Sequence, residues 1–122
     1  MPAPLPALPD LLFADAARPL LVVHALSAIV LLGSSLHLAV LGALLLLRGR
    51  CPAKLVRVHV RVSSIAFATT FALGLVMYPA FRVLVRGVVL DREAPWASNA
   101  FDFKEALVLV AVPVVAALFV GA

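Results

Sequence analysis

The sequence PLLVVHALSAIVLLGSSLHLAVLGALLLL at residues 19–47 has 29 consecutive positions without Asp, Glu, Lys or Arg. An α-helix needs about 20 apolar residues to cross the hydrocarbon core of a bilayer, so this stretch is long enough. Two further uncharged runs follow it, over 62–81 and 106–122. The whole chain is 65% hydrophobic and 13% charged, whereas soluble domains are roughly 45–50% apolar and 25% charged. The sequence therefore predicts an all-α integral membrane protein with three transmembrane helices.

The predicted organisation is one transmembrane domain behind a short N-terminal segment. Four prolines among residues 1–9 favour an extended conformation. The same segment carries no Lys or Arg before Arg18, so it lacks the basic region of a secretory signal peptide. The expected bounds are 1–18 for the extended segment, 19–122 for the transmembrane domain, and about 19–47, 57–81 and 101–122 for its spans.

The connection between the second and third spans is expected to contain a short helix at the membrane surface. Pro79 lacks an amide hydrogen and is expected to bend or end the second helix. After it, Arg82 and Arg86 lie one helical turn apart in an otherwise apolar stretch. This pattern is typical of an interfacial helix or of a continuation of the span, and we predict the former.

The distribution of charge predicts the orientation in the membrane. Five basic residues and no acidic residue lie between the first two spans, and all six acidic residues lie on the other side. The positive-inside rule then places this connection in the cytoplasm, in contact with anionic lipids, and the N-terminus in the periplasm. An Arg-rich, Ala-, Leu- and Val-rich composition favours a bacterial inner membrane. The five basic residues are Arg48, Arg50, Lys54, Arg57 and Arg61.

Small residues predict which faces of the first two helices meet. At 100° per residue, each helix has a stripe of small side chains that falls on one face. Transmembrane helices approach closely at such stripes, because lipid provides no hydrophobic drive for their association. The first stripe consists of Ala28, Ser35, Ala39 and Gly42, and the second of Ser63, Ala66, Thr70 and Gly74.

His37 is predicted to point away from the second helix. His37 follows Ala28 by nine residues, which rotates its side chain about 180° from the first stripe. It also lies 11 residues before Arg48, which corresponds to a depth of about 16 Å in the membrane at 1.5 Å per residue. The third span offers no donor or acceptor side chain after Glu105. A polar ring at this depth needs a partner. A backbone carbonyl freed by Pro113 is one candidate; otherwise we expect His37 to contact another chain or a cofactor.

Three cofactors remain open alternatives. Haem b would be held by His24 and Met77, which lie at similar depths on facing stripes. His37 and His59 are not expected to hold a haem together, because counting residues places His59 about 10 Å shallower than His37. Bacteriochlorophyll would be ligated by His37, with Gly33 leaving room for the macrocycle. A quinone head group would bind His24 near the outer surface. A structural, hydrogen-bonded histidine is the alternative to all three.

Several function classes are not expected. Beyond Asp102 and Glu105 at the start of the third, the spans contain no acidic residue for a proton or ion pathway. Cys51 has no histidine–carboxylate arrangement beside it, so no catalytic site or metal site is predicted. The basic residues behind the net charge of +4 flank apolar spans. They are therefore explained by membrane topology rather than by nucleic-acid binding.

Two short motifs carry a family resemblance. The sequences YPAFR at 78–82 and FDFKE at 101–105 resemble a YPxFR…FDxKE outer segment in small uncharacterised bacterial inner-membrane proteins. In those proteins a histidine tends to follow the Lys-Glu pair, and Ala106 stands at that position here. The resemblance implies a membrane location and no established activity.

These expectations lead to one function and one alternative. The first is an accessory transmembrane subunit of a multi-subunit bacterial energy-converting complex, respiratory or photosynthetic, which stabilises the assembly with other transmembrane subunits and frames lipid, quinone or pigment. The alternative is a haem b- or bacteriochlorophyll-binding electron-transfer or antenna subunit. In both cases the chain itself is not expected to be an enzyme.

Overall fold

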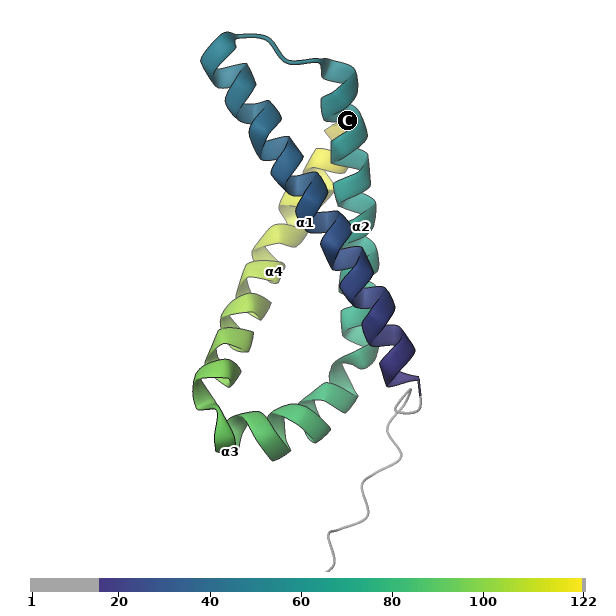
Figure 1. The fold of residues 1–122 in the computed structure, drawn as a ribbon, viewed down its shortest axis with the longest axis vertical. Coiled ribbons are helices and arrows are strands. Elements are labelled where there is room, and N and C mark those ends of the chain that lie inside the picture. The colour runs from purple at the N-terminus through teal and green to yellow at the C-terminus, as the bar shows by residue number, and fades with distance from the viewer. Residues whose placement is uncertain (1–15, 122) are drawn as a thin grey trace, which may run out of the picture.

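The computed structural model describes residues 16–121, and these residues form helices joined by short connections (Figure 1). The described part contains no strand, so the predicted all-α class is confirmed. The predicted extended segment 1–18 lies almost entirely outside the described residues. The elements are α1 (Ala17–Arg48), α2 (Ala53–Ala80), η1 (Phe81–Leu90), α3 (Asp91–Glu93) and α4 (Pro95–Gly121).

Three helices are long and apolar enough to cross a membrane. They cover Ala17–Arg48, Ala53–Glu93 and Pro95–Gly121, and the three predicted spans fall within them. The second helical stretch is 41 residues long because α2 continues through η1 into α3 without a break. The segment after Pro79 is therefore an extension of α2 rather than a separate helix.

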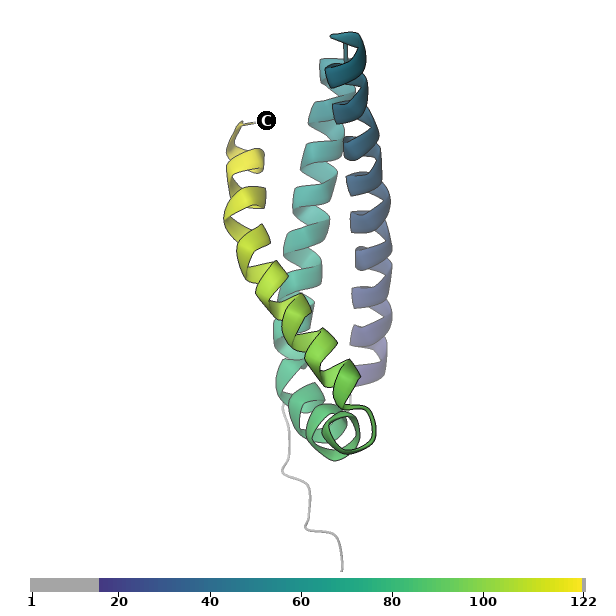
Figure 2. The ribbon, with the colours of Figure 1, turned by 90° about the vertical axis from the view of Figure 1, so that its left-hand side faces the viewer.

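A π-helical segment redirects the chain after Pro79. Proline removes one backbone hydrogen bond and crowds the preceding turn, and π-helical turns accommodate such a disturbance. The amide of Phe81 reaches the carbonyls of both Met77 and Tyr78 at this point. Figure 1 shows η1 running across the direction of α2, and Figure 2 shows its coils nearly end-on. This bend carries the chain sideways before α4 returns toward the other end.

The helices α1 and α2 form an antiparallel pair. On each helix one series of buried or half-buried residues recurs at alternating steps of three and four, which is the heptad spacing of coiled-coil packing, although Ser64 and Ala66 of α2 are also buried outside this series. On α1 these residues are Ala17, Leu20, His24, Ser27, Leu31, Ser34, Leu38 and Leu41, and on α2 they are Val56, Val60, Ser63, Phe67, Thr70, Gly74 and Met77.

Two hydrogen bonds between the helices fix the register of this pair. The Thr70 hydroxyl donates to Ser27 Oγ at 2.8 Å, and the Ser34 hydroxyl donates to the His59 carbonyl at 3.1 Å. A hydroxyl among apolar side chains gains most from such a partner, because no water competes for it. Ser34 is only 7% exposed. Sliding either helix by one residue would break both bonds.

The predicted stripe on the first helix requires a correction. Ser35, Ala39 and Gly42 are exposed, and Ala28 is half-buried at the edge of the contact. The face toward α2 lies about one residue earlier and includes the larger side chain of Leu41. The stripe was predicted from residue size alone. The face of α1 that contacts α2 instead combines hydroxyl-bearing residues with leucines in a heptad pattern. On α2, the four predicted residues Ser63, Ala66, Thr70 and Gly74 are buried or half-buried.

The helix α4 packs on α2 and η1 and, within residues 16–121, not on α1. The Phe81 and Phe101 rings stack with their centroids 4.4 Å apart, close to where α4 begins. From there α4 runs back toward the other end of the molecule at an angle to α2, as both views show (Figures 1 and 2). The three long helices therefore form an open arrangement, with α2 in the middle.

The register of α1 and α2 can be tested by cross-linking. In a Cys51→Ser background, the pair Ser27→Cys and Thr70→Cys is expected to form a disulfide. Their hydroxyl oxygens lie 2.8 Å apart, which is compatible with the Cβ separation of about 3.5–4.5 Å that a disulfide needs. Gel mobility with and without reductant measures the product. The control pair replaces Ser27 by its neighbour Leu26, which is 58% exposed, and equal cross-linking of both pairs would contradict the register.

Candidate functional site

A cleft of about 560 Å³ lies between α1, α2 and α4. Most of its lining is apolar and aromatic, as is usual for sites that bind small molecules. Its polar side chains come from all three helices and include a histidine, a tyrosine and an adjacent pair of opposite charges. The lining residues that matter below are Phe67, Phe71 and Phe101 among the aromatic ones, and His24, Thr70, Tyr78, Lys104 and Glu105 among the polar ones.

A second cavity of about 340 Å³ adjoins this cleft toward η1. Five residues line both cavities, and we call them the waist. Three of the five have polar side chains, so polar groups gather where the two spaces meet. The waist consists of His24, Gly74, Tyr78, Phe101 and Lys104.

The imidazole of His24 packs against α2 at Gly74. A Cβ atom built on Gly74 would come within 3.5 Å of His24 Cε1 and 4.0 Å of Nδ1. The Nδ1 atom is buried and has no hydrogen-bond partner among residues 16–121. A buried N–H without a partner costs more free energy than a buried acceptor without one. In a neutral ring the proton is therefore placed on Nε2. Nε2 is then the donor that a molecule in the two cavities can reach.

Met77 and His24 line the same smaller cavity, as the haem hypothesis required of them. The histidine nevertheless lacks a feature that metal-ligating imidazoles almost always have. Such a ring donates its second N–H to a carbonyl, carboxylate or water, which fixes its orientation. The Nδ1 atom of His24 has no such acceptor. This ring is therefore better suited to hydrogen bonding than to holding a metal.

The predicted direction of His37 is wrong, and so is the predicted difference in height between His37 and His59. Its Nδ1 atom lies 2.8 Å from the Gly33 carbonyl of its own helix. Its ring stacks on that of His59, with centroids 5.1 Å apart and planes inclined by 26°. His59 Nδ1 in turn lies 3.0 Å from the Leu55 carbonyl. The His37 ring is thus satisfied within the chain and contacts the second helix that it was expected to avoid.

The error in the relative heights of His37 and His59 has a simple geometric cause. Counting at 1.5 Å per residue from the first charged residue of each helix assumes that Arg48 and Arg57 lie at the same height. The bond from Ser34 to the His59 carbonyl shows instead that His59 is level with the middle of α1. His37 therefore lies level with the arginines around His59. Stacked rings also leave no space for a porphyrin between these two histidines.

The remaining predicted residues lie away from the cleft. The five basic residues at the α1–α2 connection are all exposed. Gly49 caps the end of α1 with a left-handed φ of 63°. This basic end lies opposite to the end that carries η1 (Figure 1). Among residues 16–121, no group of three or more His, Cys, Asp or Glu side chains could hold a metal ion.

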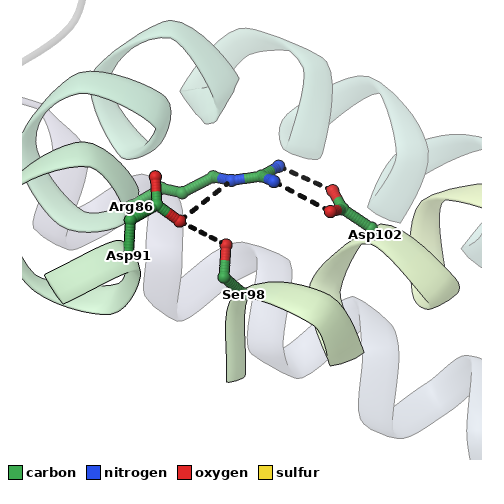
Figure 3. Close-up of polar contacts among 4 residues, drawn as sticks. All are labelled: Arg86, Asp91, Ser98 and Asp102. Atoms are coloured by element: carbon green, nitrogen blue, oxygen red, sulfur yellow. Dashed lines mark hydrogen bonds and ion pairs between the residues drawn. The ribbon is translucent and has the colours of Figure 1, made fainter. Parts of the chain in front are cut away.

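An ion-pair network holds the α4 side of the cleft in place. Arg86 on η1 makes two contacts with the Asp102 carboxylate, at 2.9 and 2.7 Å, and a longer one of 3.7 Å with Asp91. Asp91 also accepts a hydrogen bond from Ser98, which is only 5% exposed (Figure 3). The contribution of Ser98 was not predicted from the sequence. Two turns of α4 that carry Phe101 and Lys104 are fixed in this way.

The chain matches no protein-family model, no curated protein and no solved structure. The function must therefore be argued from the geometry of the cleft.

The space around Gly74 can be tested by substitution. Gly74→Ala is expected to be neutral or to stabilise by up to about 1 kcal/mol, because its Cβ meets His24 at an ordinary contact distance and alanine favours the helix. Gly74→Leu is expected to cost about 1–3 kcal/mol, because it displaces the imidazole. Thermal unfolding in detergent measures both. Gly42→Leu is the control, since nothing lies within 4 Å of a Cβ there, and equal losses for the two leucine variants would contradict this packing.

The network around Arg86 can be tested by hydrogen exchange. Asp102→Asn removes the charge that Arg86 contacts twice, so the first turns of α4 are expected to open more often. Ion pairs near the surface contribute little to stability, and exchange in peptides covering 98–104 should therefore rise by only a few-fold. Glu93→Gln on α3 changes an exposed acid nearby and is the control. Unchanged exchange in the Asp102 variant would show that the network does not hold α4.

Proposed function

We propose that the chain is an accessory transmembrane subunit of a multi-subunit energy-converting complex in a bacterial inner membrane. In this role it stabilises the assembly and frames a lipid, quinone or pigment between α1, α2 and α4. The observation that carries the proposal is the cleft itself: three apolar helices leave a space lined with aromatic rings, with polar groups at one end. A mostly apolar cleft with a few polar groups at one end is typical of a site that binds a small molecule.

The outer surface of the helices supports the membrane location. Large apolar side chains are exposed around all three, and the most exposed include Leu46 at 88%, Val120 at 86% and Leu32 at 72%. A soluble protein rarely exposes so much contiguous apolar surface, whereas lipid or other transmembrane helices cover it readily. The basic end then faces the cytoplasm, and η1 with α3 lies along the periplasmic surface.

The openness of the bundle supports the partnership with other subunits. Within the described residues, α4 packs on α2 and η1 but not on α1. The long helices thus leave room for a further helix or a lipid along the cleft. His37 gives no support to this proposal, because its ring is satisfied by Gly33 and His59. The proposal now depends on the cleft and on the packing of α4.

The second candidate is a subunit that holds haem b or bacteriochlorophyll. The single observation in its favour is that His24 and Met77 line one cavity. The missing acceptor at His24 Nδ1 counts against it. An absorption spectrum of the purified protein decides between the two candidates, since either pigment would colour the preparation.

Purification tests the proposed role. The tagged chain, extracted from its native membrane in a mild detergent, is expected to elute with other membrane proteins as one complex. Size-exclusion chromatography followed by mass spectrometry identifies the partners, and an unrelated three-helix protein with the same tag is the control. Recovery only as a free, colourless single chain would contradict both the accessory role and its alternative.

A further inference from the structure

We infer that the waist binds the head of a membrane quinone, a neutral ring whose carbonyl oxygen accepts a hydrogen bond from His24 and whose apolar tail lies along the larger cleft. This inference rests on the proposed membrane location and selects one occupant among those that the cleft could frame. Three features of the two cavities carry it: their polarity gradient, their charge balance and the donor at His24.

The polarity of the cleft changes along its length. Near η1 it is lined by His24, Tyr78 and Lys104. One heptad further along α1 and α2, about 10 Å away, the lining consists of Leu31 and Phe67. A molecule that fits this gradient has a compact polar head near the membrane surface and an apolar tail toward the membrane centre.

The charges at the waist favour a neutral head. Lys104 and its neighbour Glu105 both line the larger cleft, so their charges offset each other. The Lys104 ammonium also lies 4.6 Å from the centre of the Phe101 ring, which already stabilises its charge. A phosphate or fatty-acid head would require a surplus of positive charge. Exposed Arg18, Arg82 and Arg92 also lie at this end of the molecule, but none of them lines either cavity.

The tautomer of His24 supplies the hydrogen bond. Because Nδ1 is buried against Gly74 without a partner, Nε2 carries the proton and needs an acceptor. A quinone carbonyl is such an acceptor, and the Tyr78 hydroxyl at the same waist can serve a second oxygen. The aromatic walls offer flat surfaces against which a ring can stack, since Phe101 lines both cavities and Phe71 lines the larger one.

Binding of a soluble quinone to the purified full-length chain tests this inference. Decylubiquinone is titrated into the protein in detergent, and isothermal calorimetry measures affinity and stoichiometry. Saturable binding of one molecule per chain is expected. His24→Leu should weaken it by roughly tenfold through loss of the donor, and His24→Gln, which keeps an N–H, should retain most of it. His37→Leu is the matched control on the same helix and should leave the affinity within about twofold.

Other results would overturn the inference. Non-saturable uptake of decylubiquinone, equal weakening by His24→Leu and His37→Leu, or displacement of the quinone by oleate or by dioleoylphosphatidylglycerol would each do so. The outcome is separable from that of the proposed function, because the same variants can be purified from the native membrane. Loss of quinone binding with partners retained defeats only the inference. Quinone binding by a chain without partners defeats only the accessory role.

Discussion

The register of α1 against α2 determines where every other functional group lies. It depends on two hydroxyl groups, since Thr70 donates to Ser27 and Ser34 donates to the His59 carbonyl. Between transmembrane helices apolar contact alone discriminates poorly among registers, because lipid tails are as apolar as leucine. A hydroxyl that must find an acceptor at one height discriminates sharply. With this register His24 lies over Gly74, and His37 meets the ring of His59.

The cleft exists because α4 is held at one end and diverges from α1. Pro79 and the π-helical segment after it turn the chain across the bundle, so α4 starts away from α2 and approaches it farther along (Figure 1). Arg86 then joins η1 to α4 through Asp102, and the stacked Phe81 and Phe101 rings complete the attachment. A direct hairpin between α2 and α4 would bring the helices together along their whole length. The sideways segment keeps the cleft open near the polar residues of the waist.

The spans could be predicted from the sequence, because run length and charge are local properties. The helix contacts could not, since a wheel at 100° per residue gives the direction of a side chain only relative to its own helix. Ser35 and Gly42 were chosen for their size, whereas the contact uses Ser34 and Leu41, one position earlier. The heptad spacing of Ser27, Ser34 and Leu41 was present in the sequence and could have identified this face. The pairing of Ser98 with Asp91 depends on the bend after Pro79, which no local pattern specifies.

The three histidines show when a polar residue in an apolar helix indicates a partner. The Nδ1 atoms of His37 and His59 each contact the carbonyl four residues earlier in the same helix, so each ring is anchored by its own backbone. Serine and threonine can do the same, as Thr69 does with Ile65. His24 differs because its Nδ1 atom lies against Gly74, where no acceptor reaches it. Depth within a span is therefore weak evidence for a binding site. An imidazole whose own backbone does not satisfy it, at the junction of two cavities, is stronger evidence, and His24 is the histidine that meets this criterion.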